Sequence, residues 1–335
     1  MQEQTLVGIA RLAAASPSLR RKRVVEYYQL PAESILNRCS SERMPFRWTI
    51  NPYRGCEFGC KYCYARYTHE FMGLQDPLEF EEKIYSKRDA GALLRRELTA
   101  NPDGEIAIGT ATDPYQPAER VYQTTRSILE VLSEFRGLRI SITTKSDLIT
   151  RDSELLREIG RENSVRVHLT ITTLNAELAR VMEPRAPRPE LRLRALAALA
   201  RAGIRTMVNA MPVLPGITDG PGELEALAAQ AARNGATQFA TSVLFLKPSA
   251  KAAFLPFLEE RFPSLLPRYT ALYARSAYLR GAYEQSLTRR VDRIRRLHGW
   301  AIEPAETNLP AFGLRRQIQL FPGPPAVQPR GNDPA

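Results

Sequence analysis

The sequence of 335 residues is poor in cysteine and histidine, with four and three residues, and it lacks long apolar runs. No run approaches the roughly 18 residues that a membrane-spanning helix needs. Its first residues place an acidic side chain early and basic side chains late, the reverse of a secretory signal. A Walker-type phosphate loop, an H-E-x-x-H zinc motif and a G-x-S-x-G nucleophile motif are also missing. These absences predict a cytoplasmic protein with reduced thiols and no membrane partner.

Acidic side chains are also in deficit, with 36 Asp and Glu against 47 Lys and Arg, so the net charge is +11. A basic balance predicts an anionic partner such as a nucleic acid or nucleotide. The alternative explanation is compositional, because 40 of the basic residues are Arg and alanine is abundant. Codon composition produces such a bias without any functional cause, so a nucleic acid stays a candidate partner.

Strand and helix patterns alternate through the middle of the chain and predict an α/β fold with a parallel sheet. Each strand pattern precedes a helix or a turn into one. Six units are too few for a closed eight-stranded barrel, so we expect a partial barrel or an open sheet. In either fold the functional side chains lie at the C-terminal ends of the strands. The predicted strands cover residues 49–55, 105–110, 138–145, 165–173, 204–216 and 236–246.

Composition divides the chain into four predicted parts. Residues 1–46 form an N-terminal extension, and residues 47–248 form the α/β core. Residues 249–305 form a helical C-terminal extension that is rich in Arg and Tyr and packs on the core. Residues 306–335 are rich in Pro and Gly, which predicts a disordered tail.

Three of the four cysteines, Cys56, Cys60 and Cys63, form a C-x3-C-x2-C run on the loop after the first predicted strand. Such a run can hold one metal centre. A structural zinc site with His69 as fourth ligand is one hypothesis, although the second C-x2-C half typical of such sites is absent. Cys39 is another candidate for the fourth ligand, but it lies seventeen residues before the run, on the far side of the first strand. A disulfide fits a cytoplasmic protein poorly, and a ferredoxin-type cluster needs a fourth cysteine nearby. The remaining hypothesis is a 4Fe–4S cluster with one iron left open for a substrate or cofactor.

This run, with Tyr62 directly before the last cysteine, resembles the signature of the radical S-adenosylmethionine (SAM) superfamily. The segments NPYRGCEFGCKYCYAR, GTATDPYQPAE, TTKS and EPRAP are similar to its spore photoproduct lyase-like branch. The resemblance implies a partial (β/α)6 TIM-type barrel over about residues 48–247. It also implies that a reduced 4Fe–4S cluster cleaves SAM to a 5′-deoxyadenosyl radical that abstracts hydrogen from a substrate. An electron donor such as flavodoxin or ferredoxin is then a partner.

The resemblance also implies four residues that bind SAM. Tyr62 lies along the adenine, Thr112 and Lys145 contact the carboxylate, and Thr170 contributes a hydroxyl. The alternatives are turn chemistry for Thr112, a solvated strand end for Lys145 and a plain β-branched strand residue for Thr170.

Two further positions bear on the substrate. Thr110 stands where the lyase has the cysteine that returns a hydrogen atom to its product, and no cysteine follows Cys63. A hydroxyl O–H bond is too strong to donate hydrogen well, so this departure argues against photoproduct repair by the lyase mechanism. Glu183 and Arg185 follow a predicted helix, where Arg185 could clamp a phosphate or the edge of the SAM ribose. The alternative, which we prefer, is a salt bridge that ends the helix.

Three functions remain open from the sequence. The first is a radical SAM enzyme that acts on a nucleic acid or nucleotide. The second is a radical SAM enzyme that acts on a protein or small metabolite, with the basic charge incidental. The third is a non-enzymatic zinc-binding module.

Overall fold

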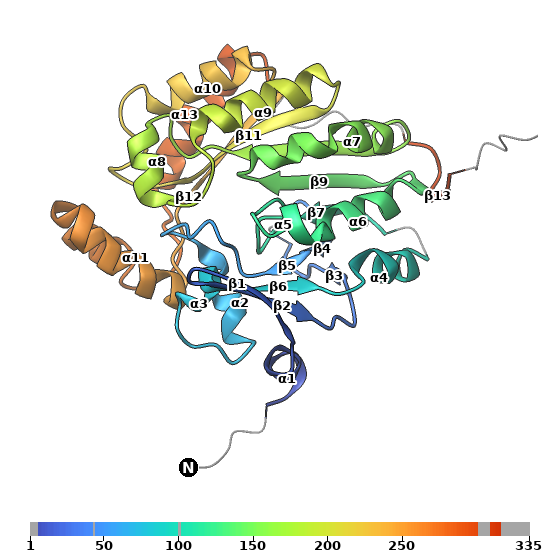
Figure 1. Cartoon of the computed structure of the whole chain (residues 1–335). Helices are drawn as coiled ribbons and strands as arrows, with labels where there is room; N and C mark the ends of the chain where they lie inside the picture. Colours follow the sequence, from blue (N-terminus) through green and yellow to red (C-terminus); the bar gives the residue numbers. More distant parts are fainter. Residues whose placement is uncertain (1–5, 43, 100–101, 301–308, 316–335) are drawn as a thin grey trace, which may run out of the picture.

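A seven-stranded sheet forms the centre of the computed structural model, which describes residues 6–42, 44–99, 102–300 and 309–315 (Figure 1). The strand order is β12-β11-β10-β9-β7-β4-β3. The six strands from β4 to β12 are parallel and adjacent in chain order, whereas β3 pairs antiparallel at one edge. This open sheet confirms the predicted α/β class and is compatible with a partial barrel. The strands are β3 Leu36–Arg38, β4 Trp48–Ile50, β7 Glu105–Ile108, β9 Arg139–Thr144, β10 Ser164–Thr170, β11 Arg205–Val213 and β12 Gln238–Val243.

Helices on the crossover connections cover the outer face of this sheet, as Figure 1 shows for α6, α7 and α9. The main apolar core lies between these helices and the strands, with Ile142, Val167 and Val208 completely buried. Parallel strands covered in this way read as nearly continuous apolar runs, which is why the sequence showed them clearly. The helices are α4 Ala90–Glu97, α5 Glu119–Tyr122, α6 Thr124–Leu132, η2 Asp147–Asp152, α7 Ser153–Ile159, α8 Ala176–Met182, α9 Pro189–Arg201 and α10 Glu223–Arg233.

A second sheet, with the order β1-β2-β6-β5, lies beside the first and was not foreseen from the sequence. The residues predicted to be an N-terminal extension therefore contribute strands to both sheets. Strand β5 is the segment that leads into the cysteine run, and it pairs antiparallel with β6. This pairing holds the start of the cysteine loop. The elements are α1 Gly8–Ala14, β1 Ser18–Lys22, β2 Val25–Leu30, β5 Tyr53–Arg54, η1 Tyr64–Arg66, α2 Tyr67–Glu70, α3 Glu79–Glu82 and β6 Lys83–Lys87.

Helices of the predicted C-terminal extension pack against the core. Phe254, Phe257 and Leu258 of α11 belong to the same buried apolar cluster as Cys56 and Cys60. Helix α11 therefore covers the cysteine loop, while α13 contacts β12 and α10. The helices are α11 Pro248–Arg261, η3 Pro263–Leu265, α12 Leu266–Leu272 and α13 Ala282–Leu297.

The prediction of a disordered tail from residue 306 is wrong for residues 309–315. Strand β13, Gly313–Leu314, pairs antiparallel with β8, Phe135–Arg136. The ring of Phe312 stacks on Phe135 at 5.9 Å between centroids, and Arg315 forms ion pairs with Glu158 and Glu162. These contacts offset the entropy that ordering the segment costs. The other residues of the predicted tail lie outside the described residues.

In the described part of the chain, no helix is both long enough and apolar enough to cross a membrane.

Candidate active site at the cysteine loop

The cysteine loop, residues 55–63, leaves the second sheet through a turn that requires glycine. Gly55 has φ +79°, and a Cβ there would lie 2.6 Å from the carbonyl oxygen of Lys83 and 2.8 Å from that of Phe80. The N–H of Cys56 donates to the same Phe80 carbonyl at 2.9 Å. The N–H of Cys63 donates to the carbonyl of Cys60 at 3.1 Å, which closes the end of the loop. Backbone contacts therefore set the path on which the three thiols lie.

All four cysteines are free, and those of the loop are largely withdrawn from solvent. Cys56 is 9% exposed and Cys60 is 8% exposed, while Cys63 is half-buried. Burial raises the pKa of all three thiols and raises that of Cys60 to about 12. A metal that binds these thiols must therefore displace their protons, and its positive charge would stabilise the thiolates.

The three thiols of the loop are not gathered around one point as the ligands of a single ion would be. In the described residues no group of three or more His, Cys, Asp or Glu side chains is placed to hold one metal ion. A 4Fe–4S cluster is wider, because each cysteine binds a different iron atom. His69 is turned away from this role, since its Nε2 donates to the carbonyl of Lys83 at 3.0 Å. Cys39 lies next to Arg47 at the start of β4, whereas the loop follows the other end of that strand. His69 and Cys39 are therefore not placed to act together with the three cysteines of the loop.

A buried glutamine clamps the loop, and the sequence analysis missed it. Gln116 is fully buried and lies just after β7. Its Oε1 accepts from the N–H of Glu57 at 2.9 Å, and its Nε2 donates to the carbonyl of Gly55 at 3.1 Å. Its amide thus bonds to the residues on both sides of Cys56. The hydroxyl of Thr112 also donates to the Gly55 carbonyl, at 2.6 Å, and accepts from Gln116 Nε2 at 3.0 Å.

Asp113 connects this clamp to the end of β9. One carboxylate oxygen accepts from the hydroxyl of Thr144 at 2.6 Å, and the other accepts from the N–H of Lys145 at 2.7 Å. Burial raises the pKa of Asp113, although these donors oppose the shift. The carboxyl group therefore places Thr112 and Lys145, which come from different strand ends, on the same side of the loop.

A buried charge network lies beside Cys60. The Lys145 ammonium is 5.7 Å from the ring centroid of Tyr62, and the Tyr62 hydroxyl donates to Glu183. Glu183 also pairs with Arg192, and both side chains are at most 1% exposed. Burial opposes the charged form of Lys145, but the neighbouring Cys60 and Glu183 raise its pKa above the usual value. A permanent cation at this position suits the carboxylate of a bound ligand.

Thr170 joins the same network through its backbone, because its carbonyl accepts from Arg192 at 3.0 Å. Burial also opposes the charged form of Glu183, but Arg192 and Lys145 hold its pKa below 4.5. The sequence analysis preferred a salt bridge at Glu183 and Arg185, but Glu183 pairs with Arg192, a partner that the sequence did not suggest. Arg185 instead donates to the carbonyls of Glu57 and Glu81.

The sequence model of the Radical SAM superfamily matches residues 50–228. The chain belongs to the radical SAM superfamily. It is therefore a radical SAM enzyme, and this superfamily works with a 4Fe–4S cluster and SAM. The alternative of a non-enzymatic zinc module is wrong.

Two curated relatives support this assignment without naming a reaction. "Uncharacterized protein Rv2578c" of Mycobacterium tuberculosis is 35% identical over 271 residues, which cover 80% of this chain and 79% of the relative. "Uncharacterized protein MJ0683" of Methanocaldococcus jannaschii is 31% identical over 173 residues, which cover 52% of this chain and 62% of the relative.

Solved structures of spore photoproduct lyase have the same fold. One mutant matches with a TM-score of 0.61 and 17% identity, over 81% of this chain and 79% of the lyase. A second mutant, with bound AdoMet and dinucleoside spore photoproduct, matches with a TM-score of 0.58 and 14% identity over the same shares. The lyase-like fold that the motifs implied is therefore confirmed.

Proposed function

We propose that Cys56, Cys60 and Cys63 hold the cluster of this enzyme and that its substrate is a nucleic acid or nucleotide. The observation that carries the first part is three free thiols on one clamped loop, two buried and one half-buried, with the Lys145 ammonium beside them. When bound, the cluster supplies the electron that cleaves SAM and thereby produces a 5′-deoxyadenosyl radical that abstracts hydrogen from the substrate.

The side chains around the loop then bind SAM. Lys145 pairs with its carboxylate, and Tyr62 lies along its adenine. Thr112 acts through its hydrogen bond to Gly55 and stiffens the loop. Thr170 lies at the end of β10, buried beside the same network. The buried apolar cover from α11 excludes water and stray hydrogen donors.

An aromatic row supports the nucleic-acid substrate. Tyr64 follows Cys63 directly, and its ring lies 4.9 Å from that of Phe245. Phe245 stacks on Tyr278 at 5.4 Å, and the Arg280 guanidinium lies 5.8 Å from the Tyr278 ring. Tyr278 is 45% exposed, so the row runs from the loop to the surface. Unpaired bases stack on such rings, and the net charge of +11 attracts their phosphates.

Anaerobic reconstitution tests the cluster ligands. The chain is loaded with iron and sulfide, SAM and a reductant are added, and 5′-deoxyadenosine is measured. We expect Cys56→Ala, Cys60→Ala and Cys63→Ala to abolish the product, while Cys39→Ala retains it. Full activity in any loop variant, or its loss in Cys39→Ala, would contradict the assignment.

Oligonucleotide binding tests the substrate class. We expect a single-stranded oligonucleotide to bind with an affinity that falls as salt rises. Tyr278→Ala should weaken binding, and Tyr278→Phe should restore it because phenylalanine keeps the ring face. Binding that is absent or independent of salt would favour a protein or small metabolite as the substrate.

A further inference from the structure

Two basic side chains, Arg54 and Lys87, lie together on one face of the second sheet, on strands β5 and β6 of Figure 1. Arg54 pairs with Tyr85 across these strands, and Lys87 follows Tyr85 by two residues, so both cations project from the same face. The N–H of Lys87 donates to the carbonyl of Pro52, just before β5, at 3.1 Å. The two cations therefore lie where β5 leads into the cysteine loop.

The surroundings of these two cations are apolar. Leu30 pairs with Lys87 from the neighbouring strand β2 and belongs to a buried cluster with Tyr85 and Met72. Lys87 is only 7% exposed, and Arg54 is half-buried. Burial, and after it the positive charge of Arg54, lowers the pKa of Lys87 to about 8. Two cations in such a place repel each other and lose their hydration, which is costly unless an anion accompanies them.

Within the described residues, no acidic side chain forms an ion pair or a hydrogen bond with Arg54 or Lys87. The Nε of Arg54 is buried without a partner. The other nitrogen atoms of the two side chains also lack a partner there, but they keep contact with solvent. The charge of Glu97 reaches Lys87, yet its carboxylate accepts from the N–H groups of Ile35 at 3.1 Å and Leu36 at 2.6 Å. The donors of both cations are thus free for an anion that enters from solvent.

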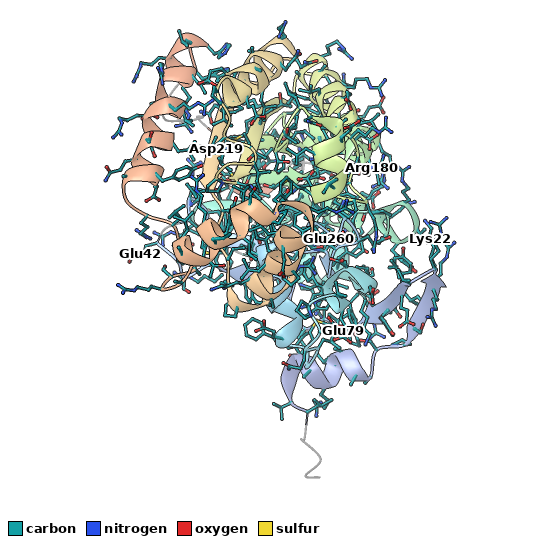
Figure 2. The ribbon with its side chains drawn as sticks, turned by 90° about the vertical axis from the view of Figure 1, so that its left-hand side faces the viewer. Lys22, Glu42, Glu79, Arg180, Asp219 and Glu260 are labelled. Atoms are coloured by element: carbon teal, nitrogen blue, oxygen red, sulfur yellow. The ribbon has the colours of Figure 1, made fainter. Side chains whose placement is uncertain are left out.

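The other lysine of β6 shows the arrangement that a structural role produces. Lys83 lies at the opposite end of the strand and pairs at 2.7 Å with Glu79, which Figure 2 labels in the lower part of the molecule. Both side chains keep contact with water, with 31% and 21% of their surface exposed. The more exposed lysine thus has an acid beside it. The buried Lys87 needs one more, but the described residues supply none.

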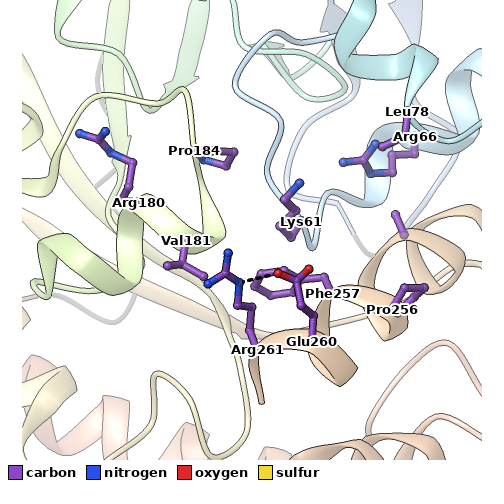
Figure 3. A pocket seen from close by; sticks show the side chains of 11 residues that line it. Lys61, Arg66, Leu78, Arg180, Val181, Pro184, Pro256, Phe257, Glu260 and Arg261 are labelled. Carbon is purple, nitrogen blue, oxygen red and sulfur yellow. Dashed lines mark ion pairs between the residues drawn. The ribbon is translucent and has the colours of Figure 1, made fainter. Parts of the chain in front are cut away.

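A second group of cations lines a cavity of about 580 Å³ against α8 and α11 (Figure 3). Arg261 pairs there with Glu260 at 3.0 Å, and Arg66 is paired with an acid of its own. Arg180 is exposed and Lys61 is half-buried, so water solvates both. The charges around that cavity are therefore stable without a ligand, in contrast to the two cations of the second sheet.

We propose that Arg54 and Lys87 form a binding site for a phosphate group, either on a nucleotide or as free phosphate. A guanidinium binds phosphate through paired N–H donors, and an ammonium binds it as a point charge. A phosphate monoester carries between one and two negative charges at neutral pH, so it balances the two cations. The inference uses neither the cluster ligands nor the residues expected to bind SAM, so it stands independently of the proposed function.

Calorimetric titration of the reconstituted chain with inorganic phosphate tests the site, in a chloride buffer of equal ionic strength. We expect one phosphate to bind per chain. Lys87→Met and Arg54→Met should each raise the Kd by about 10- to 150-fold, because each removes a charge-assisted hydrogen bond. Lys83→Met removes the same charge from the same strand, but at a position with an acid partner, and should leave the Kd unchanged.

Urea unfolding in phosphate-free buffer gives a readout that a lysine with a structural partner would not give. Because Lys87 has no partner among the described residues, Lys87→Met should be at least as stable as the wild type. Added phosphate should then stabilise the wild type but not this variant.

A nucleoside 5′-monophosphate and its parent nucleoside distinguish the two sources of the phosphate group. If a nucleotide is the ligand, the monophosphate binds more tightly than inorganic phosphate, inorganic phosphate displaces it, and the nucleoside does not bind at this site. If free phosphate is the ligand, inorganic phosphate binds at least as tightly as the monophosphate. Either result supports the site when Lys87→Met weakens the binding.

Three results would overturn the site. The first is a wild-type chain that binds neither inorganic phosphate nor the monophosphate. The second is a Kd that Lys87→Met and Arg54→Met leave unchanged, or that Lys83→Met raises as much as they do. The third is a marked loss of stability in Lys87→Met without phosphate, because Lys87 would then have a partner within the chain itself.

Discussion

Replacing Gln116 with leucine removes the amide that clamps the cysteine loop, while a side chain of similar size still fills the buried site. Three groups lose a partner, the N–H of Glu57, the carbonyl of Gly55 and the hydroxyl oxygen of Thr112. The carbonyl keeps the hydroxyl of Thr112 at 2.6 Å, so only the N–H is left unsatisfied in a buried position. One buried unsatisfied donor costs about 1–3 kcal/mol. We therefore expect Gln116→Leu to lose about that much stability.

Two assays measure this loss. In urea, with a slope of about 3 kcal/mol/M, the unfolding midpoint should fall by about 0.3–1 M. If the loop opens locally, iron release to a chelator should become about 5- to 150-fold faster, because about 1.4 kcal/mol corresponds to a tenfold change. Iron content is measured before the challenge so that both proteins start equally loaded.

A matched substitution controls for the loss of a glutamine. Gln230 lies half-buried on α10, and Gln230→Leu removes no buried hydrogen bond in the described structure. It should change stability by less than about 0.5 kcal/mol. If Gln116→Leu behaves like this control in both assays, the clamp does not hold the loop and the reasoning is refuted.

The remaining predictions concern the charge network beside Cys60. Glu183→Gln leaves the Arg192 charge buried without its partner and should cost about 3–5 kcal/mol in urea unfolding; a loss below about 1 kcal/mol would contradict the buried pair. Because the pKa of Glu183 is held below 4.5 in the folded state, its contribution is complete above that pH. The stability difference between wild type and variant should therefore shrink as the pH falls below 4.5, and a difference that grows would be inconsistent with the shift. Lys145→Met should raise the Kd for SAM by about 10- to 150-fold, while Lys251→Met on α11 should leave it unchanged; equal affinities would remove Lys145 from the site.

Local pattern was sufficient for the strands of the main sheet. Each of the six parallel strands is short, apolar and followed by a helical pattern, so residues that are close in sequence are enough to predict it. The second sheet was missed because its strands pair residues that are far apart, such as Tyr28 with Tyr85. The order at Phe312 was missed for the same reason, because this ring stacks on the distant Phe135, whereas its Pro- and Gly-rich sequence neighbours predict disorder.

The cysteine spacing already placed three thiols on one loop after the first strand, because a short loop keeps its members close whatever surrounds it. The motif also identified the chemistry of the family. Tyr62 and Lys145 were found by resemblance, and the structure brings them together. Gln116 had only a weak signal, as a polar residue within the quoted segment GTATDPYQPAE.

Folding alone assembled the supports of the site. Gln116 reaches Glu57 across 59 residues, and Tyr62 reaches Glu183 across 121. No periodicity or spacing encodes such contacts, because they arise when parallel strand ends meet at one edge of the sheet. Burial then sets the chemistry, since the removal of water makes each unpaired amide or charge costly. Composition and motif therefore established which thiols are present and which family they belong to, whereas packing established which side chains hold the loop that carries them.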